Sequence, residues 1–238
     1  PFFITKQNLR NIRNDIFPIL FLACTNASIP FYLFSKAGLD LNAGTMSVLN
    51  GTTPLFSFLI ATFWLKLSSN WVQFLGILIG MIGLIVFVGY ESLEFSLIAI
   101  ILCLAASFLY AFSSNFIFKT KEIDATYLAS ITLLFATFIV FPFTFLEDGL
   151  HFNHDTPVLL SVFLLGFACT GLAYMGYVVL IKRVGPVKAS TVVLIVPVSG
   201  MLWANIFLNE AITLTMLVGS FLILTGVGLV NFFKDEIS

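Results

Sequence analysis

The chain has 238 residues and a formal net charge of −1, and 59% of its residues are hydrophobic while only 10% are charged. Soluble domains carry roughly a quarter charged residues, so this composition excludes a soluble globular protein and indicates one that lies within a membrane. The three cysteines stand singly in different apolar stretches, which excludes a disulfide framework.

Eight apolar windows follow one another along the chain, and each has about the 20 residues that a helix needs to cross a bilayer. They are continuously apolar, which favours helices over the shorter alternating strands of a membrane barrel. The connections are short, so we expect an all-α polytopic membrane protein with no separate soluble domain. The windows are residues 16–34, 45–65, 72–89, 95–118, 126–146, 158–181, 189–208 and 214–233.

The positive residues are distributed unevenly between the two sides that these crossings define. Ten of the eleven Lys and Arg residues fall on one side, and Lys36 falls on the other. Cytoplasmic loops carry the excess of Lys and Arg, so we expect both ends of the chain to face the cytoplasm. The split also supports eight crossings, because one missed or false crossing would mix the two sets.

An internal repeat relates residues 44–86 to residues 187–229 at an offset of 143 positions. Pro54 then aligns with Pro197, Gly76 with Gly219, and residue 83 with residue 226, both glycines. The second span and its counterpart, the seventh, cross in opposite directions because five crossings separate them. Such inverted-topology repeats are common in secondary transporters, whose substrate site lies between the repeats.

The first three spans match the last three, so the fourth and fifth spans lack counterparts in the first unit. We therefore expect eight helices of an original ten, arranged as two five-helix repeats. Residues 1–90 would hold the last three helices of the first repeat, and residues 91–238 the whole second repeat. The alternative is a genuine eight-helix protein.

The segment 183–190, RVGPVKAS, with Pro197, Glu210 and Gly219 after it, resembles the second EamA domain of the drug/metabolite transporter superfamily. Residues 99–134 are similar to the opening of that domain. The resemblance implies a ten-helix permease of the bacterial inner membrane that exports amino acids, other small metabolites or drugs. It also implies coupling to the proton gradient or to exchange.

Polar side chains within the spans are the candidate substrate-binding residues, because in lipid they need partners or water. They lie on helical stripes in the first, second, fourth and sixth spans, and we expect them to line a central cavity. The alternative is a set of interhelical hydrogen bonds, each about 0.6–2 kcal/mol. The candidates are Asn26, Tyr32, Ser47, Asn50, Tyr110, Ser114, Tyr174 and Tyr177.

Three further residues are predicted to serve the transport cycle. Pro54 and Pro197 lie within matching spans, where proline kinks a helix, and are candidate hinges; static kinks that serve packing are the alternative. Glu210, at the corner after the seventh span, is the candidate proton-linked group, and a solvated interfacial role is its alternative. The middle of every span lacks ionisable residues.

The sequence contains no nucleotide loop, nucleophile–base pair or metal-ligand pattern, so we expect no enzyme and no cofactor. The expected partners are a small-molecule substrate and the lipid bilayer, with no nucleic acid, and a homodimer is left open. A secondary transporter is the preferred function. A membrane scaffold or sensor that keeps the fold without transport is the alternative, and solute flux would distinguish the two.

Overall fold

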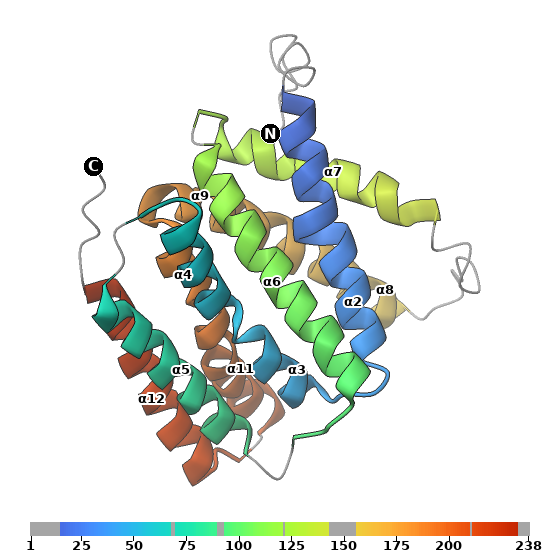
Figure 1. Ribbon diagram of the computed structural model, residues 1–238. Coiled ribbons are helices and arrows are strands. Elements are labelled where there is room, and N and C mark those ends of the chain that lie inside the picture. The colour runs from blue at the N-terminus through green and yellow to red at the C-terminus, as the bar shows by residue number, and fades with distance from the viewer. Residues whose placement is uncertain are drawn as a thin grey trace.

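The computed structural model describes residues 15–67, 70–89, 93–120, 122–142, 156–209 and 211–232, which form helices and short connections without a strand among them (Figure 1). Seven helical segments in these residues are long and apolar enough to cross a membrane. The predicted all-α polytopic fold is therefore confirmed. The fifth window holds a shorter apolar helix, α7 (Ala125–Val140), and its residues after 142 lie outside the described part. The seven segments are Asp15–Ala37, Ala43–Phe63, Trp71–Val88, Leu97–Lys119, Thr156–Val184, Pro186–Phe207 and Leu214–Phe232.

Some spans are single α-helices and others are interrupted. The uninterrupted ones are α5 (Trp71–Val88), α6 (Leu97–Lys119) and α12 (Leu214–Phe232). The first span contains the π-helical η1 (Ala23–Ser28) before α2 (Ile29–Ala37), and the sixth contains the π-helical η4 (Leu165–Leu172) between α8 (Thr156–Leu164) and α9 (Ala173–Val184). The second span is divided into α3 (Ala43–Asn50) and α4 (Thr53–Phe63), and the seventh into α10 (Pro186–Ser190) and α11 (Val192–Leu208).

Helix starts and corners repeat at the offset found in the sequence. Helices α3 and α10 begin at positions 43 and 186, and α5 and α12 begin at 71 and 214, so each pair is 143 residues apart. Among the described residues, Lys66 and Asn209 are the non-glycine residues with positive φ, at 53° and 54°, and they too are 143 apart. Few non-glycine residues adopt this conformation, so the shared corner geometry is independent support for the repeat.

Helices α5 and α12 make the most extensive packing in the described structure and lie side by side (Figure 1). A Cβ atom added at Gly76 would lie 2.7 Å from the carbonyl oxygen of Gly226, and one added at Gly83 would lie 2.9 Å from that of Gly219. Only glycine permits such backbone contact, as in other membrane helix pairs. These glycines therefore serve close packing between the two helices.

These contacts also establish the inverted topology. As the position along α5 rises from Gly76 to Gly83, the contacting position on α12 falls from Gly226 to Gly219, so the two helices are antiparallel. Since Gly76 corresponds to Gly219 and Gly83 to Gly226, each contact has its counterpart in the other repeat. A self-complementary contact of this kind is the mark of a two-fold axis, here a pseudo-two-fold axis between the repeats.

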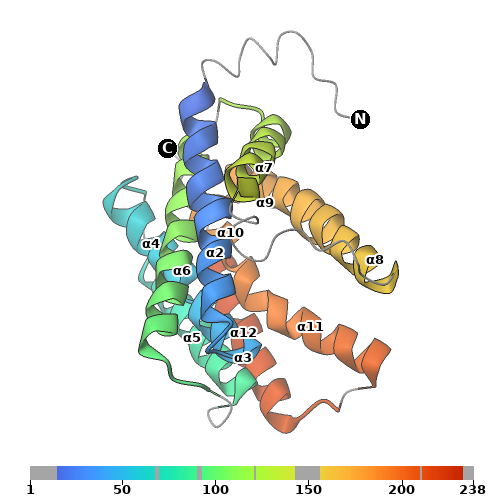
Figure 2. The ribbon, with the colours of Figure 1, turned by 90° about the vertical axis from the view of Figure 1, so that its right-hand side faces the viewer.

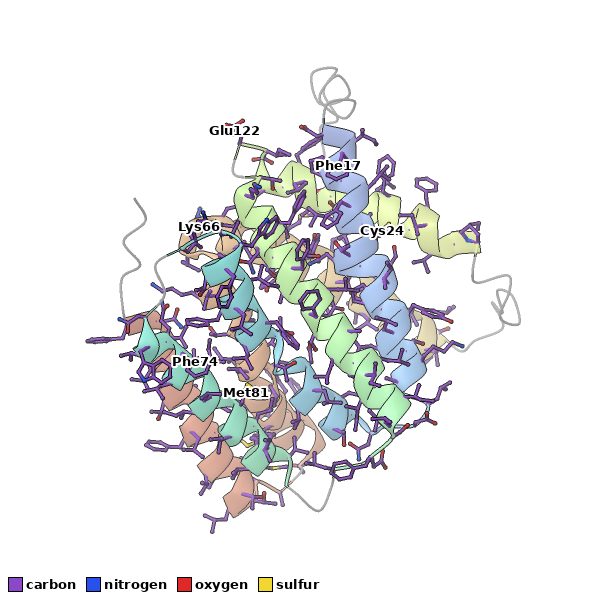
Figure 3. All side chains as sticks on the ribbon, in the orientation of Figure 1. Phe17, Cys24, Lys66, Phe74, Met81 and Glu122 are labelled. Atoms are coloured by element: carbon purple, nitrogen blue, oxygen red, sulfur yellow. The ribbon has the colours of Figure 1, made fainter. Side chains whose placement is uncertain are left out.

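The turns form two groups at opposite ends of the bundle. At one end, Lys182 Nζ donates a hydrogen bond of 2.9 Å to the carbonyl oxygen of Thr120, which joins the end of α9 to the end of α6. Lys66 and Glu122 lie at this same end (Figure 3). At the other end, the backbone N–H of residue 42 donates to the Glu94 carboxylate at 2.6 Å. Most of the described cations thus lie at one end, as the predicted topology requires.

The glycine crossing yields a stability prediction with an internal control. Gly226→Ala should lower the free energy of unfolding by about 1–3 kcal/mol, since its Cβ would lie 2.5 Å from backbone atoms of Gly76 and Gly80. Gly228→Ala should have little effect, because nothing lies within 4 Å of a Cβ at that position. Thermal unfolding in detergent would measure both. Equal stability of the two variants would contradict the close crossing.

Candidate functional site

Helix α6 lies between α2 and α4 and packs against both (Figure 1). Its hydroxyl side chains reach other spans. Ser107 Oγ donates to the carbonyl oxygen of Leu49 on α3 at 3.2 Å, and Ser113 Oγ donates to Thr25 Oγ1 in η1 at 2.8 Å. Hydroxyl groups buried in apolar surroundings need such partners, so these bonds fix how α6 packs against the first repeat.

The adjacent residues of α6 point to other sides of the helix and bond to two more spans. The hydroxyls of Ser114 and Tyr177 on α9 lie 3.1 Å apart within hydrogen-bond distance. Asn115 is fully buried, and its Nδ2 donates to Ser57 Oγ on α4 at 3.1 Å. One short segment of α6 therefore carries hydrogen bonds to η1, α4 and α9, and Ser107 adds α3.

Three tyrosines and two aliphatic hydroxyls gather between α6, α7 and α9. We call them the tyrosine cluster: Tyr110, Ser114, Thr132, Tyr174 and Tyr177. Tyr177 is close enough to both Tyr110 and Tyr174 for electrostatic interaction, and Thr132 lies against Tyr174. The Tyr110 ring also stacks on Phe34 of α2, with ring centroids 6.0 Å apart. The cluster thus reaches the first span through α2.

Several buried polar atoms at or beside this cluster lack a hydrogen-bond partner among the described residues. Asn115 Oδ1 is one of them, and Tyr174 Oη and Thr132 Oγ1, which lie against one another, bond to nothing else there. A buried polar atom without a partner destabilises the fold by about 1–3 kcal/mol, so a native structure usually supplies one. A ligand atom or a water molecule would satisfy them, and the available chemistry is that of neutral hydroxyls and a carboxamide.

The structure brings together four of the candidates predicted from sequence, namely Tyr110, Ser114, Tyr174 and Tyr177. The other four lie on the first two spans. Asn26 is buried in η1, and Asn50 and Ser47 are half-buried on α3, where the Asn50 carboxamide oxygen accepts a 3.2 Å bond from Thr53. Tyr32 is 53% exposed on α2, beneath the Lys36 ammonium and away from the cluster.

The two prolines predicted as hinges occupy different positions in their helices. Pro54 lies in the first turn of α4, where helix N–H groups have no partner within the helix anyway. Pro197 lies inside α11. Glu210, the predicted proton-linked residue, lies outside the described residues.

Sequence reasoning did not include Thr132 or Asn115 in the site. A buried carboxamide within an apolar span was the signal available for Asn115. Thr132 gave no such signal, since hydroxyls in membrane helices commonly bond to their own backbone. None of the fully buried polar side chains in the described residues is acidic or basic, and no group of three or more His, Cys, Asp or Glu there could hold a metal ion.

Fold and site together define a polytopic membrane protein of two inverted repeats, with neutral polar groups where the repeats meet. The chain matches the EamA-like transporter family over residues 1–89 and 97–232, and it belongs to that family. Its multi-pass helices therefore lie in a lipid bilayer.

Similar proteins include uncharacterized transporters from bacteria and an archaeon. One from Archaeoglobus fulgidus is 24% identical, with 84% of this chain and 72% of its own length covered. YoaV from Bacillus subtilis is 26% identical, covering 79% of this chain and 66% of YoaV. One from Buchnera aphidicola is 28% identical, and the alignment covers 92% of this chain and 76% of the relative. A protein of known crystal structure, 15% identical in sequence, superposes with a TM-score of 0.78. The superposition covers 92% of this chain and 78% of that protein's chain, which shows a shared fold.

The Ser114–Tyr177 contact is open to a double-mutant cycle. Ser114→Ala and Tyr177→Phe each remove one hydroxyl, and the two changes should be coupled by about 0.6 kcal/mol, the usual value for an interhelical hydrogen bond in a membrane protein. Unfolding of the single and double variants in mixed micelles would measure the coupling. Strict additivity would mean that the two hydroxyls do not bond to one another.

Proposed function

We propose that this protein is a secondary transporter that exports small metabolites, such as amino acids or drug-like solutes, by alternating access between its two inverted repeats. We place it in the inner membrane of a bacterium, with both ends cytoplasmic. In this class of fold the substrate binds near the middle of the membrane between the repeats.

The observation that carries the proposal is the set of polar side chains along α6. This helix belongs to the second repeat, yet Ser107, Ser113 and Asn115 all bond to spans of the first. The hydrogen-bonding groups of the spans thus concentrate where the repeats meet. The tyrosine cluster adjoins them and supplies aromatic faces as well as hydroxyls, and we assign it to the substrate site together with Asn50 and Asn26.

Coupling in this proposal uses the proton gradient or the exchange of one solute for another. Glu210 is the candidate proton carrier, because the fully buried polar side chains among the described residues are all neutral. We also propose two further helices equivalent to α6 and α7 in the first repeat. The alignment with the Archaeoglobus fulgidus relative spans 72% of that protein, which leaves room for them.

Reconstituted vesicles test the proposal directly. Proteoliposomes loaded with a radiolabelled mixture of amino acids should release label faster than empty liposomes, with and without an imposed pH gradient. Asn50→Ala and Tyr177→Phe should reduce the initial rate at least about tenfold if each removes a substrate hydrogen bond of 1.4 kcal/mol or more.

Thr225→Ala is the matched control, because its hydroxyl is exposed on α12 and bonds only to the Phe221 carbonyl of its own helix. It should transport at the wild-type rate. Folded protein that moves neither amino acids nor a panel of drug-like solutes would favour a scaffold or sensor instead. Unchanged transport by Tyr177→Phe would remove that residue from the site.

A further inference from the structure

The two repeats differ in where their fourth helices, the second and seventh spans of the chain, are interrupted. In the first repeat the interruption lies at residues 51–52, between α3 and α4. In the second it lies at Thr191, between α10 and α11. At the repeat offset of 143, Thr191 corresponds to position 48, so the second interruption comes about one helical turn earlier.

This difference changes the role of the matching prolines. Pro54 follows its interruption closely and therefore lies in the first turn of α4, where its missing N–H removes no helical bond. Pro197 lies six residues after Thr191, inside α11, where the ring opposes the helix and the carbonyl of residue 193 loses its usual donor. Pro54 is thus accommodated at a helix start, whereas Pro197 lies where proline disfavours a helix.

Side chains hold the first interruption where it is. The Leu49 carbonyl accepts a bond of 2.6 Å from the Thr52 hydroxyl and a longer one of 3.2 Å from Ser107 Oγ of α6, whose proton is shared with the Cys103 carbonyl of its own helix at 2.9 Å. These bonds satisfy a carbonyl next to the break, and Ser107 ties it to the other repeat. At the second interruption the hydroxyls of Ser190 and Thr191 bond only to carbonyls of their own turn, Val187 and Lys188.

From these contacts we propose that the two interruptions exchange positions during the transport cycle. In the opposite state the second span breaks near position 48 with Pro54 inside a helix, and the seventh breaks near 194–195 with Pro197 in a first turn. This rests on the proposed function, since alternating access between inverted repeats lets each repeat adopt the other's conformation. The prolines then bias the equilibrium in opposite directions.

The burial of two equivalent serines provides the readout. Ser190 is fully buried and its counterpart Ser47 is half-buried, so the exchange would bury position 47 and expose position 190. Ser47→Cys and Ser190→Cys would be introduced singly into a chain whose Cys24, Cys103 and Cys169 are replaced by Ala. The rate of reaction with a small water-soluble methanethiosulfonate reagent is then measured in nanodiscs.

Removing each proline should have opposite effects. Pro197→Ala removes the proline from inside α11 and favours the state described here, so the Ser47/Ser190 ratio of labelling rates should rise. Pro54→Ala favours the exchanged state, so the same ratio should fall, with roughly tenfold between the two variants, since an interior proline strongly disfavours a helix. Pro157→Ala, exposed at the start of α8, is the control and should leave the ratio unchanged.

Ser107→Ala is a second route to the same result, because it removes the α6 bond to Leu49 and should lower the ratio as Pro54→Ala does. A ratio that moves in the same direction for both prolines, or for neither, would overturn the exchange and leave two static kinks. Labelling needs no substrate, so the two proposals can fail separately. Opposite shifts of the labelling ratio without solute flux would refute the proposed transport but not the exchange. Solute flux without opposite shifts of the ratio would refute the exchange but not transport.

Discussion

The backbone contact between α5 and α12 is the constraint on which the rest of the structure depends. Two helices can approach so closely only where glycine removes the side chain, and here the glycines recur on both helices at matching positions. Because each contact has its counterpart in the other repeat, the pair defines the pseudo-two-fold axis. The less regular spans then take their places around a rigid pair, and Figure 2 shows α8 and α11 diverging from the packed helices.

Helix α6 provides the second kind of cohesion, which is polar. In lipid the hydrophobic effect gives little reason for one apolar helix to prefer another, so hydrogen bonds and close packing determine the neighbours. Ser107, Ser113 and Asn115 meet partners on three different segments, and Ser114 meets a fourth. The same bonds that hold the helix also concentrate neutral polar chemistry where the repeats meet. In the proposed transporter, structural and substrate-binding roles would therefore overlap along one segment of α6.

The fold was predictable because its signals are periodic and numerous, whereas the site depends on local departures from regular helix. Apolar windows, matching glycines and the placement of cations were enough to predict the spans and their inversion. Asn26 and Tyr32 were both predicted to line the cavity from a first span taken as regular α-helix, but that span contains the π-helical η1. In the structure Asn26 is buried and Tyr32 is exposed. Likewise Pro54 and Pro197 match in sequence, but the distance of each from its interruption is set by packing.

The paired corners at Lys66 and Asn209 have a consequence for how the chain enters the membrane. Both residues adopt the same left-handed backbone, so the same hairpin geometry is built twice with different side chains. In the proposed orientation the lysine corner stays in the cytoplasm, and the asparagine corner is carried across. A translocon reads charge before any hairpin has packed. Two hairpins of the same shape can thus be inserted in opposite directions. The side chain at each corner, rather than its backbone geometry, sets the direction.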